Sequence, residues 1–117
     1  MSTFSKGYGR EWHRQLQETG WWHSFELPDG NVLKGVNSVE SLKHRVAQFP
    51  IPMDLRGKRV LDIGAWDGWF SFEMERRGAE VVAIDCFDNP RFREMHAIYN
   101  SRAEYRCMRR PRGRLYN

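Results

Sequence analysis

The sequence has few cysteines and no long apolar run, and each of these absences argues against a class of protein. No stretch of about 18 consecutive apolar residues occurs, so we expect no membrane span. The only two cysteines are Cys86 and Cys107, and the chain has no segment that resembles a secretion signal. This pattern predicts reduced thiols and a cytoplasmic protein. The four histidines form no metal-ligand spacing with these cysteines, so we expect no metal site.

The short length of the chain limits how large a fold it can form. With 117 residues the chain holds one domain at most, and a complete doubly wound sheet with helices on both faces generally needs more. Two clear parallel strands are predicted, at residues 60–63 and 81–85. Such strands are stable when neighbouring strands and helices cover them. We therefore expect either a truncated product or a chain that needs an oligomer or a partner chain to complete its sheet.

Positive charge gathers at the carboxyl end of the sequence. The net charge is +4, but residues 106–117 hold five arginines and no acid. The tail at residues 108–117 has no apolar period, and we expect it to be disordered. We favour a reading-frame change or truncation as its origin. The alternative is a basic arm that contacts RNA phosphates, and a further hypothesis is that RNA binding by this tail is the whole function.

Residues 1–52 are predicted to form an extension that precedes the main domain. A short helix is expected at residues 11–18, and Pro28-Asp29-Gly30 is typical of the turn of a hairpin. Asn37 followed by Glu40 fits the capping box of a second helix, which Pro50 ends. Residues 53–107 then form the main domain.

The main domain has the order strand, glycine loop, helix, strand, acid. The loop lies between Gly64 and Gly68, the helix is expected at residues 69–77, and the second strand ends at Asp85. A further helix is predicted from Pro90. This order predicts an α/β fold, a partial Rossmann-like, doubly wound parallel sheet of two to three strands, with a nucleotide cofactor at the carboxyl ends of the strands.

The loop residues favour S-adenosyl-L-methionine over a dinucleotide. Trp66 stands where a dinucleotide site needs its second glycine, and Asp62 brings negative charge where a pyrophosphate needs N–H groups. The same carboxylate suits the ammonium of S-adenosyl-L-methionine. Gly64 and Gly68 leave room for the ligand, and Asp85, 17 residues after Gly68, is placed to accept ribose hydroxyls. The alternative is that these acids and glycines are ordinary strand caps and turn residues.

The run GKRVLDIGAWDGWFSFEMERRGAEVVAID, residues 57–85, resembles class I S-adenosylmethionine-dependent methyltransferases. It is most similar to the group related to tRNA wobble-uridine (5-methoxyuridine) methyltransferases, in which DIG-x-x-DG replaces the commoner glycine pattern. Residues 21–30 resemble the amino-terminal signature of that group, and the similarity covers about residues 20–107. It implies contacts to the methionine part of the cofactor at Asp62, Gly64, Ala65 and Gly68, and to the ribose at Asp85. Trp66 is a further candidate contact because it lies in the same loop.

The function that follows is transfer of a methyl group from S-adenosyl-L-methionine to a tRNA uridine or a small-molecule hydroxyl. The chemistry mainly requires alignment of nucleophile and methyl group, so the lack of a catalytic triad is no obstacle, and no catalytic residue is assigned. Family members continue through further strands that carry a substrate-side motif, and this sequence lacks them. The alternative is therefore a noncatalytic cofactor-binding module or an inactive fragment.

Overall fold

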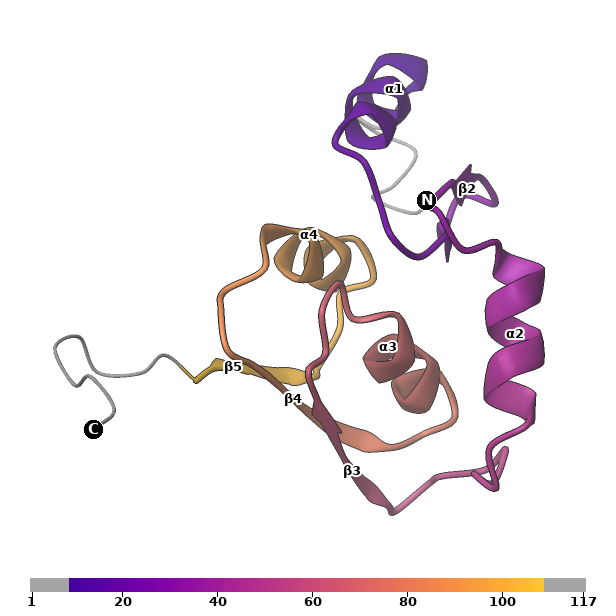
Figure 1. Ribbon diagram of the computed structural model, residues 1–117, viewed down its shortest axis with the longest axis vertical. Coiled ribbons are helices and arrows are strands. Elements are labelled where there is room, and N and C mark those ends of the chain that lie inside the picture. The colour runs from indigo at the N-terminus through magenta and orange to yellow at the C-terminus, as the bar shows by residue number, and fades with distance from the viewer. Residues whose placement is uncertain (1–8, 109–117) are drawn as a thin grey trace, which may run out of the picture. The chain divides into compact units, whose positions relative to one another are not determined.

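The protein was analysed as a computed structural model that describes residues 9–108. It divides into two compact units, Met1–Pro52 and Met53–Asn117. The first unit contains α1 (Arg10–Glu18), β1 (Phe25–Glu26), β2 (Val32–Leu33) and α2 (Val39–Ala47). The second contains β3 (Arg59–Ile63), α3 (Trp69–Arg76), β4 (Glu80–Asp85), α4 (Pro90–Ile98) and β5 (Glu104–Cys107) (Figure 1).

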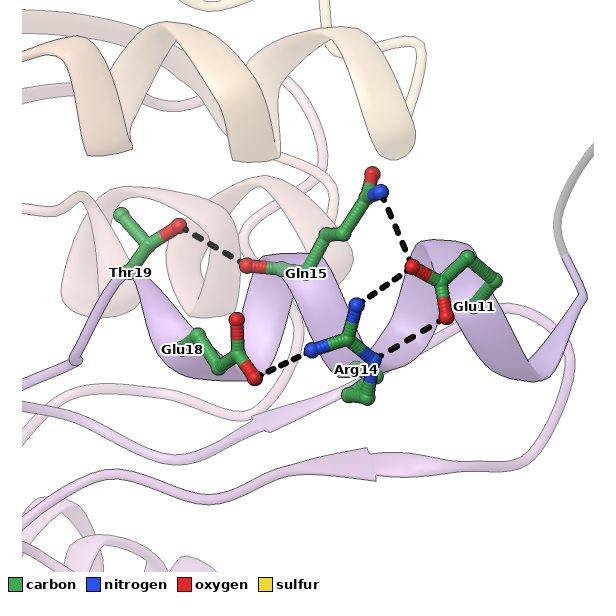
Figure 2. Close-up of polar contacts among 5 residues, drawn as sticks. All are labelled: Glu11, Arg14, Gln15, Glu18 and Thr19. Atoms are coloured by element: carbon green, nitrogen blue, oxygen red, sulfur yellow. Dashed lines mark hydrogen bonds and ion pairs between the residues drawn. The ribbon is translucent and has the colours of Figure 1, made fainter.

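Helix α1 confirms the helix predicted near residues 11–18. Its exposed side carries a charged cluster, in which Arg14 pairs with Glu11 one turn before it and with Glu18 one turn after it (Figure 2). Arg14 lowers the pKa of Glu11. Ion pairs this exposed add little to stability. The helix is fixed instead by burial of Leu16, whose carbonyl oxygen accepts a hydrogen bond from Trp21 Nε1 at 2.8 Å.

The predicted hairpin is confirmed, although its strands are only two residues long. Strands β1 and β2 pair antiparallel, and Leu27 N donates to Asn31 O at 2.8 Å across the turn. Helix α2 also forms where expected, but the predicted cap at Asn37 is wrong. Ser38 caps the helix by accepting from Ser41 N at 3.1 Å. Asn37 is engaged elsewhere, because its backbone pairs with residues 22–24 and holds the end of the hairpin.

The second unit is built on a three-stranded parallel sheet with the order β3-β4-β5. Val60 pairs with Val81 and Ala83 pairs with Tyr105, which fixes the register across all three strands. Helices α3 and α4 connect successive strands and lie over the same face of the sheet (Figure 1). This α/β arrangement is compatible with part of a Rossmann-like fold. The third strand, which has only a weak sequence pattern, is present as β5.

The core of this unit lies between the sheet and its two helices. Ala83 on the central strand is fully buried, as are Phe92 and Met95 on α4. Phe92 stacks on the ring of Tyr105 with centroids 3.9 Å apart. The ring of Phe72 on α3 lies 5.1 Å from the ring of Phe92, also between centroids. These aromatic contacts join both helices to the sheet.

The opposite face of the sheet carries an exposed apolar patch on β3 and β4, beside the charged Glu104 and Arg106 of β5. Leu61 is 57% exposed and Ile63 is 74% exposed, and their register partners Val82 and Ile84 lie beside them on the same face. No described element of this unit covers that face, and β3 has no strand on its outer edge within residues 9–108. Parallel sheets normally have both faces covered. Within the described residues, this unit therefore exposes apolar surface that parallel sheets usually bury.

Three other expectations concern the chain as a whole. Within residues 9–108, no helix has the length and apolar character needed to cross a membrane. Cys86 and Cys107 are both free thiols, as expected. The arginine-rich tail falls beyond Met108, outside the described residues.

The aromatic core gives a direct test of the fold. We expect Phe92→Ala to lower the free energy of unfolding by about 3–5 kcal/mol, because it removes a fully buried ring and leaves a cavity. Leu61→Ala, on the open face of the same unit, should change it by less than about 0.5 kcal/mol. Urea unfolding followed by circular dichroism measures both. Equal losses in the two variants would contradict this core.

Candidate cofactor site

The glycine loop between β3 and α3 is tied to the end of the neighbouring strand. Gly64 N and Ala65 N both donate to Ile84 O, at 2.9 and 3.1 Å. Gly64 has a φ of +75° and Gly68 a φ of +91°, a backbone region that favours glycine. Gly68 caps α3 at its amino end, so the loop turns directly into the helix. The predicted glycines therefore shape a tight strand-to-helix turn.

Asp85 joins this loop to β4 through its carboxylate. Oδ2 accepts from Trp66 N at 2.8 Å, and Oδ1 accepts from Cys86 N at 2.7 Å. Trp66 has a φ of +55°, which is uncommon for a bulky residue and costs free energy. The hydrogen bond from its backbone to the buried carboxylate offsets that cost. Each oxygen of Asp85 can accept a second hydrogen bond, so the group keeps capacity for a ligand hydroxyl.

Asp62 lies on the same side of the sheet as Asp85. Asp62 pairs in register with Ala83, and Asp85 is two residues further along β4, so both side chains project toward the helix-covered face. Asp62 is half-buried, and its Oδ2 accepts from Ser71 Oγ of α3 at 2.7 Å. The two acids therefore contact the loop and the start of α3 from adjacent strand ends. The predicted residues Asp62, Gly64, Ala65, Trp66, Gly68 and Asp85 are brought together at this edge.

An exposed aromatic pair borders the site. The rings of Trp66 and Phe87 meet edge to face with centroids 5.4 Å apart, and the residues are 46% and 37% exposed. Both follow the carboxyl ends of strands, on either side of Asp85. Phe87 was not predicted from the sequence, although its position two residues after the acidic strand end is the available signal. A planar base could stack on such a pair.

Two further polar residues of the site were missed by sequence reasoning. Asp67 is completely buried, and its Oδ1 accepts from Trp69 N at 3.4 Å in the first turn of α3. A carboxylate at this place is favoured by the helix dipole. Ser71 is also completely buried, with its hydroxyl on Asp62. Their proximity to a helix start was visible in the sequence, but their burial was not.

Tyr105 holds the segment that follows β4. Its hydroxyl accepts from Asn89 N at 2.8 Å and donates to Phe87 O at 3.2 Å. Burial raises the pKa of the Tyr105 phenol, and the nearby carboxylate of Asp85 raises it further. The phenol is therefore neutral near pH 7 and can serve as donor and acceptor at once. Because Tyr105 is on β5, the third strand helps to set the position of Phe87.

The chemistry of this donor set suits a ligand with a cationic end and hydroxyl groups. The predicted site contributes carboxylates at two strand ends and no lysine or arginine, which is wrong for a pyrophosphate. Among residues 9–108, no group of three or more His, Cys, Asp or Glu side chains could hold a metal ion. An acid that can meet an ammonium and an acid that can accept hydroxyl groups are the donor set that the sequence predicted for S-adenosyl-L-methionine.

Comparison with known proteins gives two partial matches. The chain is 40% identical over 68 residues to the ubiquinone biosynthesis O-methyltransferase of Psychrobacter cryohalolentis, a match that covers 57% of this chain and 24% of that protein. It is 45% identical over 60 residues to the protein of the same name from Neisseria meningitidis serogroup C, covering 48% of this chain and 25% of that protein. The chain thus spans about a quarter of the length of these curated relatives.

These matches support the resemblance to class I S-adenosylmethionine-dependent methyltransferases. They do not extend to the tRNA wobble-uridine group. No protein-family model matches the chain. No solved structure matches it either.

The two loop glycines offer a matched pair of variants. A Cβ on Gly68 would lie 2.6 Å from the Phe72 ring and 2.7 Å from the Phe92 ring, whereas a Cβ on Gly64 meets nothing within 4 Å. Both residues have positive φ. We expect Gly64→Ala to cost about 1–2 kcal/mol from backbone strain alone, and Gly68→Ala about 2–4 kcal/mol because overpacking adds to it. Urea unfolding of both variants checks the order, and a larger loss for Gly64→Ala would contradict the loop geometry.

Proposed function

We propose that this chain binds S-adenosyl-L-methionine and forms the cofactor-binding part of an O-methyltransferase. One observation carries the proposal: two carboxylates at adjacent strand ends share one face of the sheet, with Asp85 bonded to the glycine loop at Trp66 N and Asp62 bonded to Ser71 of the helix that follows the loop. Carboxylates on two neighbouring strands suit a ligand with an ammonium at one end and ribose hydroxyls at the other. The two partial relatives, both named O-methyltransferases, support the same assignment.

In this proposal the chain's residues mainly bind and orient. Asp62 holds the ammonium of the methionine part by a charge-assisted hydrogen bond. Asp85 accepts the ribose hydroxyls while it keeps the loop in place. Trp66 and Phe87 border the position of the adenine. The bound cofactor would supply a methyl group on a sulfonium, which an aligned nucleophile can displace. No catalytic residue is assigned within residues 9–108.

The favoured acceptor is a small-molecule hydroxyl. The names of both relatives specify O-methyl transfer in ubiquinone biosynthesis, which supports an oxygen nucleophile of that class. A tRNA uridine is the second candidate, on the likeness of residues 57–85 to the wobble-uridine group. Phosphate binding by the arginine-rich tail would serve that second candidate.

The proposal includes further polypeptide that completes the sheet. Strand β3 lies at an edge of the described sheet, and Leu61 and Ile63 expose apolar surface on its uncovered face. A neighbouring strand and covering helices would bury that surface and enclose the cofactor site. We propose that additional chain or a partner subunit supplies them. Without this completion, the alternative function is a noncatalytic cofactor-binding module.

Calorimetry tests the cofactor assignment. We expect S-adenosyl-L-methionine to bind the purified chain, and Asp85→Ala to weaken that binding at least about tenfold, because a charged hydrogen-bond acceptor is lost. The matched control is Asp88→Ala, which removes an acid from the same segment that pairs instead with Arg93. Its affinity should stay within about twofold of the parent, on the same scale. No heat from folded parent protein would defeat the assignment.

A methyl-transfer assay distinguishes the two candidate acceptors, a small-molecule hydroxyl and a tRNA uridine. With radiolabelled S-adenosyl-L-methionine, we expect label in a panel of small-molecule hydroxyl compounds and none in bulk tRNA. The chain should be assayed alone and with lysate fractions that could supply the missing part of the sheet. Label in tRNA would overturn the small-molecule acceptor, and cofactor binding without transfer under any condition would favour the noncatalytic module.

A further inference from the structure

Ser71 is a polar residue on the buried side of α3, where helices usually carry apolar side chains. It is the third residue of α3, and none of its surface is exposed. Serine is a poorer helix former than alanine, and a buried hydroxyl costs free energy unless it is hydrogen bonded. Its Oγ donates to Asp62 Oδ2 at 2.7 Å, a length typical of a charge-assisted hydrogen bond. The hydroxyl is therefore explained by the carboxylate that it faces.

This bond controls the orientation of Asp62. Rotation of an aspartate carboxylate about its last torsion is broad and poorly constrained by its own backbone. A donor fixed on α3 selects one orientation of the carboxylate plane, because Ser71 itself is held by burial within the helix. Asp62 lies one residue before the end of β3, on the helix-covered face, so the helix that begins at the glycine loop sets the direction of this acid.

We propose that Ser71 is a positioning residue, which orients the Asp62 carboxylate toward the cationic amino-acid end of the ligand. The inference rests on the proposed function, because it needs a ligand with an ammonium near Asp62. Beyond the proposed function, the inference assigns recognition of the ammonium end to Asp62 on β3 together with Ser71 on α3. Ser71 itself does not touch the ligand.

The chain contains a matched control for this role. Ser101 Oγ donates to Glu75 Oε1 at 2.7 Å, so it makes the same kind of bond, of the same length, to a carboxylate. That pair joins the end of α3 to the segment before β5, away from the glycine loop. Ser101→Ala therefore removes a hydroxyl-to-carboxylate bond of the same kind, together with the bond that Ser101 Oγ accepts from Ala103 N at 3.0 Å, and leaves the bond to Asp62 in place.

The test compares two probes that differ at the amino-acid end. S-adenosylhomocysteine carries the ammonium, whereas 5′-methylthioadenosine shares the nucleoside and lacks the amino-acid part. We expect Ser71→Ala to weaken S-adenosylhomocysteine about tenfold by calorimetry, as for loss of a hydrogen bond to a charged group, and 5′-methylthioadenosine less than about twofold. Ser101→Ala should leave the ratio of the two affinities unchanged, and Ser71→Thr, which keeps the hydroxyl, should retain the parent ratio.

A double-mutant cycle completes the test. Asp62→Ala should show the same selective loss as Ser71→Ala, and adding Ser71→Ala to Asp62→Ala should cause no further change in the ratio. Equal weakening of both probes by Ser71→Ala, or additive losses in the double variant, would overturn the positioning role while leaving the proposed function intact. If the folded parent binds neither probe, the proposed function itself fails.

Discussion

The carboxylate of Asp85 is the group on which the arrangement of the site depends. It accepts hydrogen bonds from Trp66 N in the glycine loop and from Cys86 N at the end of its own strand. The bond from Trp66 N joins segments that are 19 residues apart and stabilises an unusual backbone conformation at Trp66, whereas the bond from Cys86 N is local to the strand end. The same acid is the one proposed to bind ribose. The structural role and the proposed ligand-binding role therefore fall on one side chain.

Asp62 is organised by a different element. Its partner Ser71 lies in the first turn of α3, so the position of this acid depends on how that helix packs on the sheet. The packing in turn depends on Phe72 and Phe92, whose rings lie against Gly68 and leave no room for a Cβ there. The position of Asp62 therefore depends on the packing of the aromatic core.

Much of this could be predicted from the sequence because the relevant signals are local. Pro90 and Asn89 mark the start of α4, and the apolar run before Asp85 marks β4, so these elements formed as expected. The cap of α2 was wrong because the backbone of Asn37 pairs with the hairpin, a contact that local pattern cannot show. Burial of Ser71 and the role of Tyr105 depend on which elements pack together. Spacing along the chain does not contain that information.

The central claim is that Asp62 and Asp85 hold opposite ends of one sulfonium nucleoside. The most direct measurement is an NMR titration of ¹⁵N-labelled protein with S-adenosyl-L-methionine, following backbone amides. We predict that the largest shifts fall on the Gly64–Gly68 loop and on Cys86 and Phe87, with the Trp66 and Cys86 amides affected because they donate to Asp85. Shifts confined to other parts of the chain, or none at saturating ligand, would contradict the account.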